Sequence, residues 1–209
     1  MSDGDETSPG RVSKAGFADA RTVGSAPGSI ASAPVTDGSS SFSASEPLSE
    51  PGQGALLERR SRVWEDQSSN REYIDAATMV NDYLRRLGSE LAVSFEPLDE
   101  DGYTEVLRGS AQVGVNVLEE HDILLLLSRI MDVPKEGRED FYRRLLELNF
   151  LVTSDAAFAI DKDRDAVYLR AHRRLGGLDY EEFADLLAKV TSIADEWDDR
   201  LNELFPTEG

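Results

Sequence analysis

The sequence predicts an α+β fold, in which an antiparallel sheet is layered with three helices and preceded by a disordered tail. Apolar residues recur at helical spacing in three segments and alternate with polar residues in short segments between them. The expected order is helix, three to four strands, helix, two strands, helix, without the regular strand and helix alternation of a parallel sheet. Composition also changes near residue 70, so only the second part is expected to fold.

The tail is defined by its composition. Of the first 55 residues, 33 are Gly, Ser, Pro or Ala, and such a segment cannot offset the entropy lost on ordering. We therefore expect residues 1–68 to be a disordered tail and residues 69–209 to be one domain. Within 55–66, three arginines lie between two pairs of apolar residues, which indicates either a short amphipathic segment or a frayed extension of the first helix: Arg59, Arg60 and Arg62 between Leu56-Leu57 and Val63-Trp64.

The first helix is expected at about 70–88, because Ser69 and Glu72 have capping-box spacing and Gly88 is placed to end it. Alternating residues predict strands at 91–96, 103–108 and 111–117. The run 123–130 is apolar on both faces, and its shortness and the following Pro134 favour a central strand over a helix.

Residues 136–150 return to helical spacing with two apolar stripes, although one sheet can cover only one stripe. This pattern fits a helix held between its own sheet and a second copy of the protein, or a helix deep in a monomer core. A hairpin at 157–171 follows. Asp179 and Glu182 then cap a long final helix that reaches Leu204.

Charge and composition exclude several functions. The net charge is −19, which would repel nucleic acid and anionic membranes and suits a basic or mixed-charge protein partner. There is no Cys, so disulfides and thiol chemistry are excluded. The longest apolar run, 123–127, is far below the roughly 20 residues of a membrane helix, and the chain lacks a signal pattern at its start. We therefore expect a cytoplasmic protein.

Candidate chemical sites are weak. Asp161, Asp163 and Asp165 match the first ligands of a calcium loop, but Ala166 replaces the required Gly and His172 replaces the bidentate Glu. The spacing of the two histidines does not suggest a metal site, and no nucleophile or phosphate loop is recognisable. We expect no catalytic residue, no metal and no cofactor.

A family likeness is carried by Phe141-Tyr-Arg-Arg-Leu-Leu-Glu-Leu-Asn149, Ala157-Phe-Ala-Ile-Asp161, Val167-Tyr-Leu-Arg-Ala171 and Gly177-Leu-Asp-Tyr-Glu-Glu-Phe183. With the long last helix, this part resembles the type III secretion chaperone-like superfamily, which includes the CesT/Tir-chaperone family and YbjN-like proteins. The likeness covers residues 73–205 and rests on element order and a loose motif pattern.

The resemblance implies a homodimer that holds an extended segment of a client polypeptide. By position, it implies a dimer interface formed by Phe141, Tyr142, Leu145, Leu146 and Leu148. It implies a client-binding patch formed by Ile74, Val80, Leu84, Leu91, Val93 and Phe95.

The long tail departs from the secretion chaperones, which are usually little more than the domain. Two alternatives therefore stay open. The chain is also compatible with a YbjN-like regulatory or scaffolding protein without a secretion client, and with a secreted cargo protein whose tail is the signal.

Overall fold

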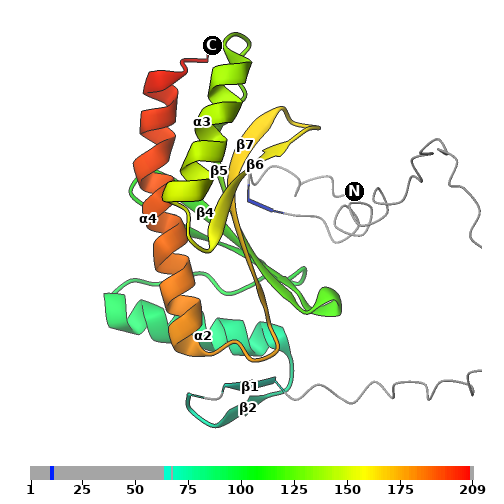
Figure 1. Ribbon diagram of the computed structural model, residues 1–209. Helices are drawn as coiled ribbons and strands as arrows, with labels where there is room; N and C mark the ends of the chain where they lie inside the picture. Colours follow the sequence, from blue (N-terminus) through cyan, green and yellow to red (C-terminus); the bar gives the residue numbers. More distant parts are fainter. Residues whose placement is uncertain (1–9, 12–63, 67, 208–209) are drawn as a thin grey trace, which may run out of the picture. The chain divides into compact units, whose positions relative to one another are not determined.

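A computed structural model describes residues 10–11, 64–66 and 68–207. This part has the expected α+β architecture, with three α-helices and an antiparallel sheet (Figure 1). Its elements are β1 (Trp64–Asp66), β2 (Arg71–Tyr73), α2 (Ala76–Leu91), β3 (Tyr103–Arg108), β4 (Ala111–Leu118), the short 3₁₀ helix η2 (Glu119–His121), β5 (Ile123–Asp132), α3 (Arg138–Leu151), β6 (Ala156–Asp161), β7 (Ala166–Arg174) and α4 (Tyr180–Leu204). Residues 64–66 of the amphipathic segment expected at 55–66 form β1, and the rest of that segment lies outside the described residues, as does most of the expected tail.

The main sheet has five strands in the order β3-β4-β5-β7-β6, and every neighbouring pair is antiparallel. Strand β5 is central, which confirms the interpretation of 123–130 as a buried strand. Strand β7 lies between β5 and β6 although it follows β6 in sequence. Helix α3 connects β5 to β6. Because β3 and β6 stand at the two ends of the strand order, they are the edge strands of the sheet.

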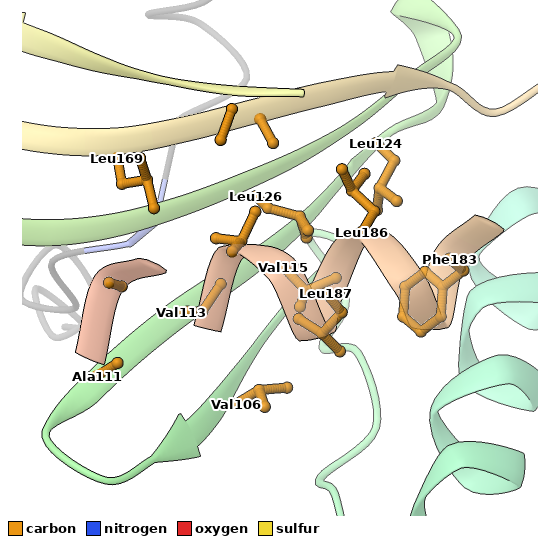
Figure 2. Close-up of a cluster of buried hydrophobic side chains, with 14 of the residues drawn as sticks. Val106, Ala111, Val113, Val115, Leu124, Leu126, Leu169, Phe183, Leu186 and Leu187 are labelled. Atoms are coloured by element: carbon orange, nitrogen blue, oxygen red, sulfur yellow. The ribbon is translucent and has the colours of Figure 1, made fainter. Parts of the chain in front are cut away.

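The core lies on one face of this sheet, where α4 packs against the strands (Figures 1 and 2). Alternate residues such as Val113 and Val115 on β4 and Leu124 and Leu126 on β5 face the helix and are fully buried. Side chains alternate across a strand, so Gly114 and Asn116 lie on the opposite face. Figure 2 shows the cluster that joins sheet to helix: Val106, Ala111, Val113, Val115, Leu124, Leu126, Leu169, Phe183, Leu186 and Leu187.

Helix α2 begins later than its sequence pattern suggested. Asp75 is the N-cap, and its carboxylate accepts a hydrogen bond from the Thr78 amide at 2.6 Å. Ser69 does not cap a helix, because its hydroxyl donates to Asp66 at 2.7 Å. Residues 71–73 pair instead with β1 as a small hairpin. The buried side chain of Trp64 joins the core, so this hairpin packs on the domain.

Segment 91–96 is not a strand, which corrects one expectation and leaves three strands between α2 and α3. Its backbone groups have other partners. The Val93 amide donates to the Gly88 carbonyl at 2.9 Å, as part of the helix ending. The Glu96 carbonyl accepts from the Thr104 hydroxyl at 2.9 Å, and the Leu98 amide donates to the Asn81 side chain at 2.8 Å. The segment is therefore held as an irregular extended chain beside β3.

Candidate functional site: an apolar groove and an exposed helix face

An apolar groove of about 600 Å³ lies between the end of α2, segment 93–96, strand β3 and helix α4. The small side chains of Ala184 and Ala188 on α4 leave room along it. The remaining lining residues are Leu87, Leu91, Val93, Ser94, Phe95, Glu96, Glu105, Val106, Leu107, Arg108, Leu187 and Thr191.

Three side chains lining the groove expose large apolar area. Leu91 is 59%, Val93 49% and Leu107 70% exposed. Leu107 belongs to β3, whose second side has no strand partner within the five-stranded sheet. An edge strand beside an apolar groove can bind an extended peptide, because the backbone offers hydrogen bonds and the groove accepts alternate side chains.

The predicted client-binding patch is divided by the structure. Val80 and Leu84 are buried in the core on the inner side of α2, which corrects their assignment to a binding surface. Leu91 and Val93 are exposed, and the half-buried Phe95 lies against Gly88. These three line the groove. Ile74 is exposed in the turn before α2 and is not a groove residue.

Sequence reasoning missed Leu107, Ala184 and Ala188 as groove residues. The available signal was the adjacent pair Val106 and Leu107 in one strand. Because neighbouring strand residues point to opposite faces, one of the two had to lie off the core face. The alanines gave no such signal, since small residues on a helix face are common in any packed core.

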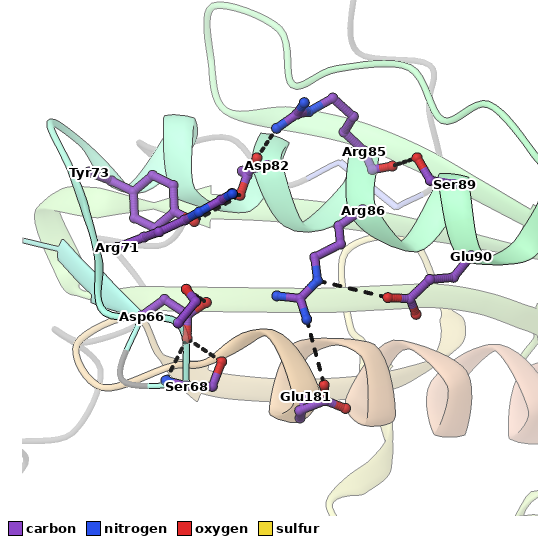
Figure 3. Close-up of polar contacts among 11 residues, drawn as sticks. Asp66, Ser68, Arg71, Tyr73, Asp82, Arg85, Arg86, Ser89, Glu90 and Glu181 are labelled. Atoms are coloured by element: carbon purple, nitrogen blue, oxygen red, sulfur yellow. Dashed lines mark hydrogen bonds and ion pairs between the residues drawn. The ribbon is translucent and has the colours of Figure 1, made fainter.

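A second cavity, of about 960 Å³, lies on the other side of segment 92–97 and is more polar. Asp82 is at its wall and accepts hydrogen bonds from the Tyr73 hydroxyl at 2.8 Å, from Arg71 at 2.9 Å and from Arg85 (Figure 3). Burial would raise the pKa of Asp82, but these hydrogen bonds and the charge of Arg85 outweigh burial and lower it. Such a carboxylate stays ionised and links β2 to α2, which is unsuitable for a general base near neutral pH.

Helix α3 has one buried and one exposed apolar side. Phe141, Leu145 and Leu148 are buried within the protomer, which corrects their assignment to a dimer interface. Tyr142 is half-buried. The second stripe of the sequence pattern is on the outside, with Leu146 69% and Phe150 88% exposed, and Leu151 extends it. We call Tyr142, Leu146, Phe150 and Leu151 the outer face of α3.

The charged hairpin turn at 162–165 is accounted for by internal contacts. The Asp161 carboxylate accepts from the amide of Asp163 at 2.9 Å, and Asp165 pairs with Arg138 at 2.8 Å. Asp163 pairs with Lys162 at 2.6 Å. Within the described residues there is no group of three His, Cys, Asp or Glu side chains that could hold a metal ion. No helix in that same part is long and apolar enough to cross a membrane.

Comparison with known proteins identifies the family of this chain. The profile of the Tir chaperone protein (CesT) family matches residues 82–198, more than half of the chain. The chain belongs to this family. Both the β3 side of the groove and helix α3 fall within the matched range. A search of curated proteins found no match.

Several solved structures contain chains similar to this one. A chain in the crystal structure of the ExsC–ExsE complex is 27% identical, with a TM-score of 0.50 over 61% of this chain and 96% of that chain. A chain of the ExoU–SpcU heterodimer from the type III secretion system of Pseudomonas aeruginosa is 20% identical, with a TM-score of 0.46 over 61% of this chain and 98% of that chain. YbjN from E. coli, described as a putative transcription regulator, is 15% identical, with a TM-score of 0.40 over 57% of this chain and 91% of that chain.

Proposed function

We propose that this chain is a non-enzymatic, cytoplasmic binding protein that dimerises and holds an extended segment of a client polypeptide, in the manner of a secretion chaperone. The observation that carries the proposal is the apolar groove beside edge strand β3. Membership of the CesT family and similarity to a chain of the ExsC–ExsE complex support it.

In this proposal the client lies along β3 with alternate apolar side chains in the groove. Full burial of an aliphatic side chain contributes about 1.5–3 kcal/mol. Leu107, which is 70% exposed, would therefore contribute about 1–2 kcal/mol on binding. Leu91 and Val93 would add smaller amounts. The client charge should be basic or mixed, because the net charge of this chain is −19.

The outer face of α3 is the proposed dimer interface. Leu146 and Phe150 lie one helical turn apart on the same side, where they form a strip that can meet its symmetry copy. Arg143 and Glu147 form an ion pair at 3.1 Å on the same helix and would lie at the rim. In a two-fold contact of this kind, each of these residues is buried once in each of the two copies.

The experiment is purification of the tagged full chain from its own cells, with Leu107→Asp compared with wild type. A stoichiometric partner should be recovered with wild type, and its affinity should fall about 5- to 30-fold or more in the variant, because 1–2 kcal/mol of burial is lost. Hydrogen exchange should show protection of β3 in the complex. Leu204→Asp is the matched control, since Leu204 is exposed but lies outside the groove.

The outcomes separate the possible functions. Partners that bind wild type and Leu107→Asp equally but depend on residues 1–60 would contradict client binding in the groove. They would favour a regulatory or scaffolding protein. Export of the chain itself would favour a secreted cargo protein.

A further inference from the structure

We propose that the sheet face opposite α4 carries a binding site for a Gly-Arg dipeptide, and that the chain's own Gly10 and Arg11 occupy this site. The two residues belong to the same compact unit as the domain. They lie across the sheet from α4, as the blue segment in Figure 1 indicates. The site does not involve the apolar groove, so the proposal stands independently of the client function.

The first element of the site is a contact between two glycines. Gly10 is buried and lies directly on Gly114 of β4. A Cβ atom on Gly10 would be 2.7 Å from the Cα and amide nitrogen of Gly114 and 2.9 Å from the Leu127 carbonyl oxygen. Real Cβ atoms do not come this close to backbone, so position 10 accepts only glycine in this arrangement. The same holds in reverse, because the nearest atoms to a Cβ on Gly114 are all backbone atoms of Gly10.

The second element is a hydrogen bond to the backbone of the segment. The buried side-chain amide of Asn116 donates to the Gly10 carbonyl at 2.8 Å. Asn116 is two residues after Gly114, so both point to the same sheet face. A buried side-chain amide needs such a partner, since burial of a polar group without a hydrogen bond is costly.

The third element recognises the arginine. The Arg11 guanidinium donates to Asp99 at 2.6 Å and to Asp101 at 2.5 Å, and lies 5.2 Å from the centre of the Tyr103 ring. Its side chain is only 13% exposed, which is unusual for arginine on a surface. Arginine suits this position better than lysine, because its fork contacts two carboxylates while its cationic carbon lies over an aromatic ring.

The acidic turn is also held by hydrogen bonds that do not involve the arginine. The Asp99 carboxylate also accepts from the amides of Tyr103 and Asp101, each at 2.9 Å. Burial would raise the pKa of Asp99, but the Tyr103 amide and Arg11 outweigh burial and hold it below its ordinary value. The turn therefore presents fixed negative charge near neutral pH.

Trypsin cleavage of the full chain after Arg11 tests the proposal, because a protease needs that arginine released. In wild type, the Arg11–Val12 bond should be cut more slowly than the same bond in a free peptide of residues 5–18. Gly114→Ala should raise the cleavage rate about 5- to 150-fold, the range expected when a methyl group is forced into a filled contact. Asp101→Asn should raise it about 1.5- to 5-fold, as for an exposed ion pair.

Gly176→Ala is the matched control, because a Cβ at Gly176 meets only ordinary contacts with Asp122. It should leave the rate unchanged. Cleavage of wild type at the free-peptide rate, or equal rates in wild type, Gly114→Ala and Asp101→Asn, would overturn the proposal. Protection that disappears on dilution would overturn occupancy by the chain's own segment, since an intramolecular contact does not depend on concentration.

Discussion

Substitution of Leu146 on the outer face of α3 gives the sharpest test of self-association. Leu146 is 69% exposed, so a partner copy that covers it would gain about 1–2 kcal/mol for each leucine. Two-fold symmetry doubles this amount to about 2–4 kcal/mol. Leu146→Asp should therefore weaken dimerisation about 30- to 700-fold, before the desolvation of the new carboxylate is added.

The neighbouring residue provides the contrast. Leu145 is buried in the protomer, and removing a buried leucine costs about 2–5 kcal/mol of folding stability. Leu145→Asp should consequently unfold the protein, whereas Leu146→Asp should change protomer stability by no more than about 0.5 kcal/mol. The adjacent positions thus separate loss of folding from loss of association.

The assay is light scattering and sedimentation over a range of concentrations, with urea unfolding of each variant. The expected result is a wild-type dimer, a folded Leu146→Asp monomer and an unstable Leu145→Asp protein. A wild type that is monomeric at about 10 μM, a concentration at which a specific dimer should persist, would refute the reasoning. So would a Leu146→Asp protein with unchanged dimer affinity.

Two further predictions concern the domain itself. Trp64→Ala should lower the unfolding free energy by about 3–5 kcal/mol, because the ring is buried in the core; an unchanged urea midpoint would mean that the β1–β2 hairpin does not pack on the domain. Asp82→Asn should destabilise the protein at pH 7, and its difference from wild type should shrink as the pH falls. The pKa of Asp82 is lower in the folded than in the unfolded chain, so its contribution is complete above the ordinary value near 3.8 and is lost as pH falls through the folded pKa. Parallel urea titrations from pH 7 to about 2.5 check this, and a difference that stays constant with pH would contradict it.

Sequence patterns were most informative where one physical requirement dominated. The run 123–130 is apolar on both faces because β5 is central, and its sequence surroundings were enough to predict a strand. The strand predicted at 91–96 was wrong, because alternation of apolar and polar residues indicates only that side chains point to opposite sides. Strand pairing also needs a backbone partner, and here the backbone groups bind α2 and Thr104 instead.

The candidate site was only partly predictable for a related reason. The sequence contained the second apolar stripe of α3, and the resemblance indicated which helix to consider. Neither decided whether Leu145 or Leu146 faces the core, since the stripes are alike in composition. Val80 and Leu84 likewise match the pattern of an exposed patch until α2 is packed on the domain.

The sequence by itself determined the three helices, the five strands of the main sheet, the acidic character and the family resemblance, because periodicity, charge and motif order are local or additive properties. Tertiary structure alone decided the insertion of β7 between β5 and β6, the groove between β3 and α4, and the approach of Gly10 to Gly114. Those features depend on which surfaces meet between residues that lie tens to about a hundred positions apart, and contact between distant surfaces leaves no periodic trace in a single sequence.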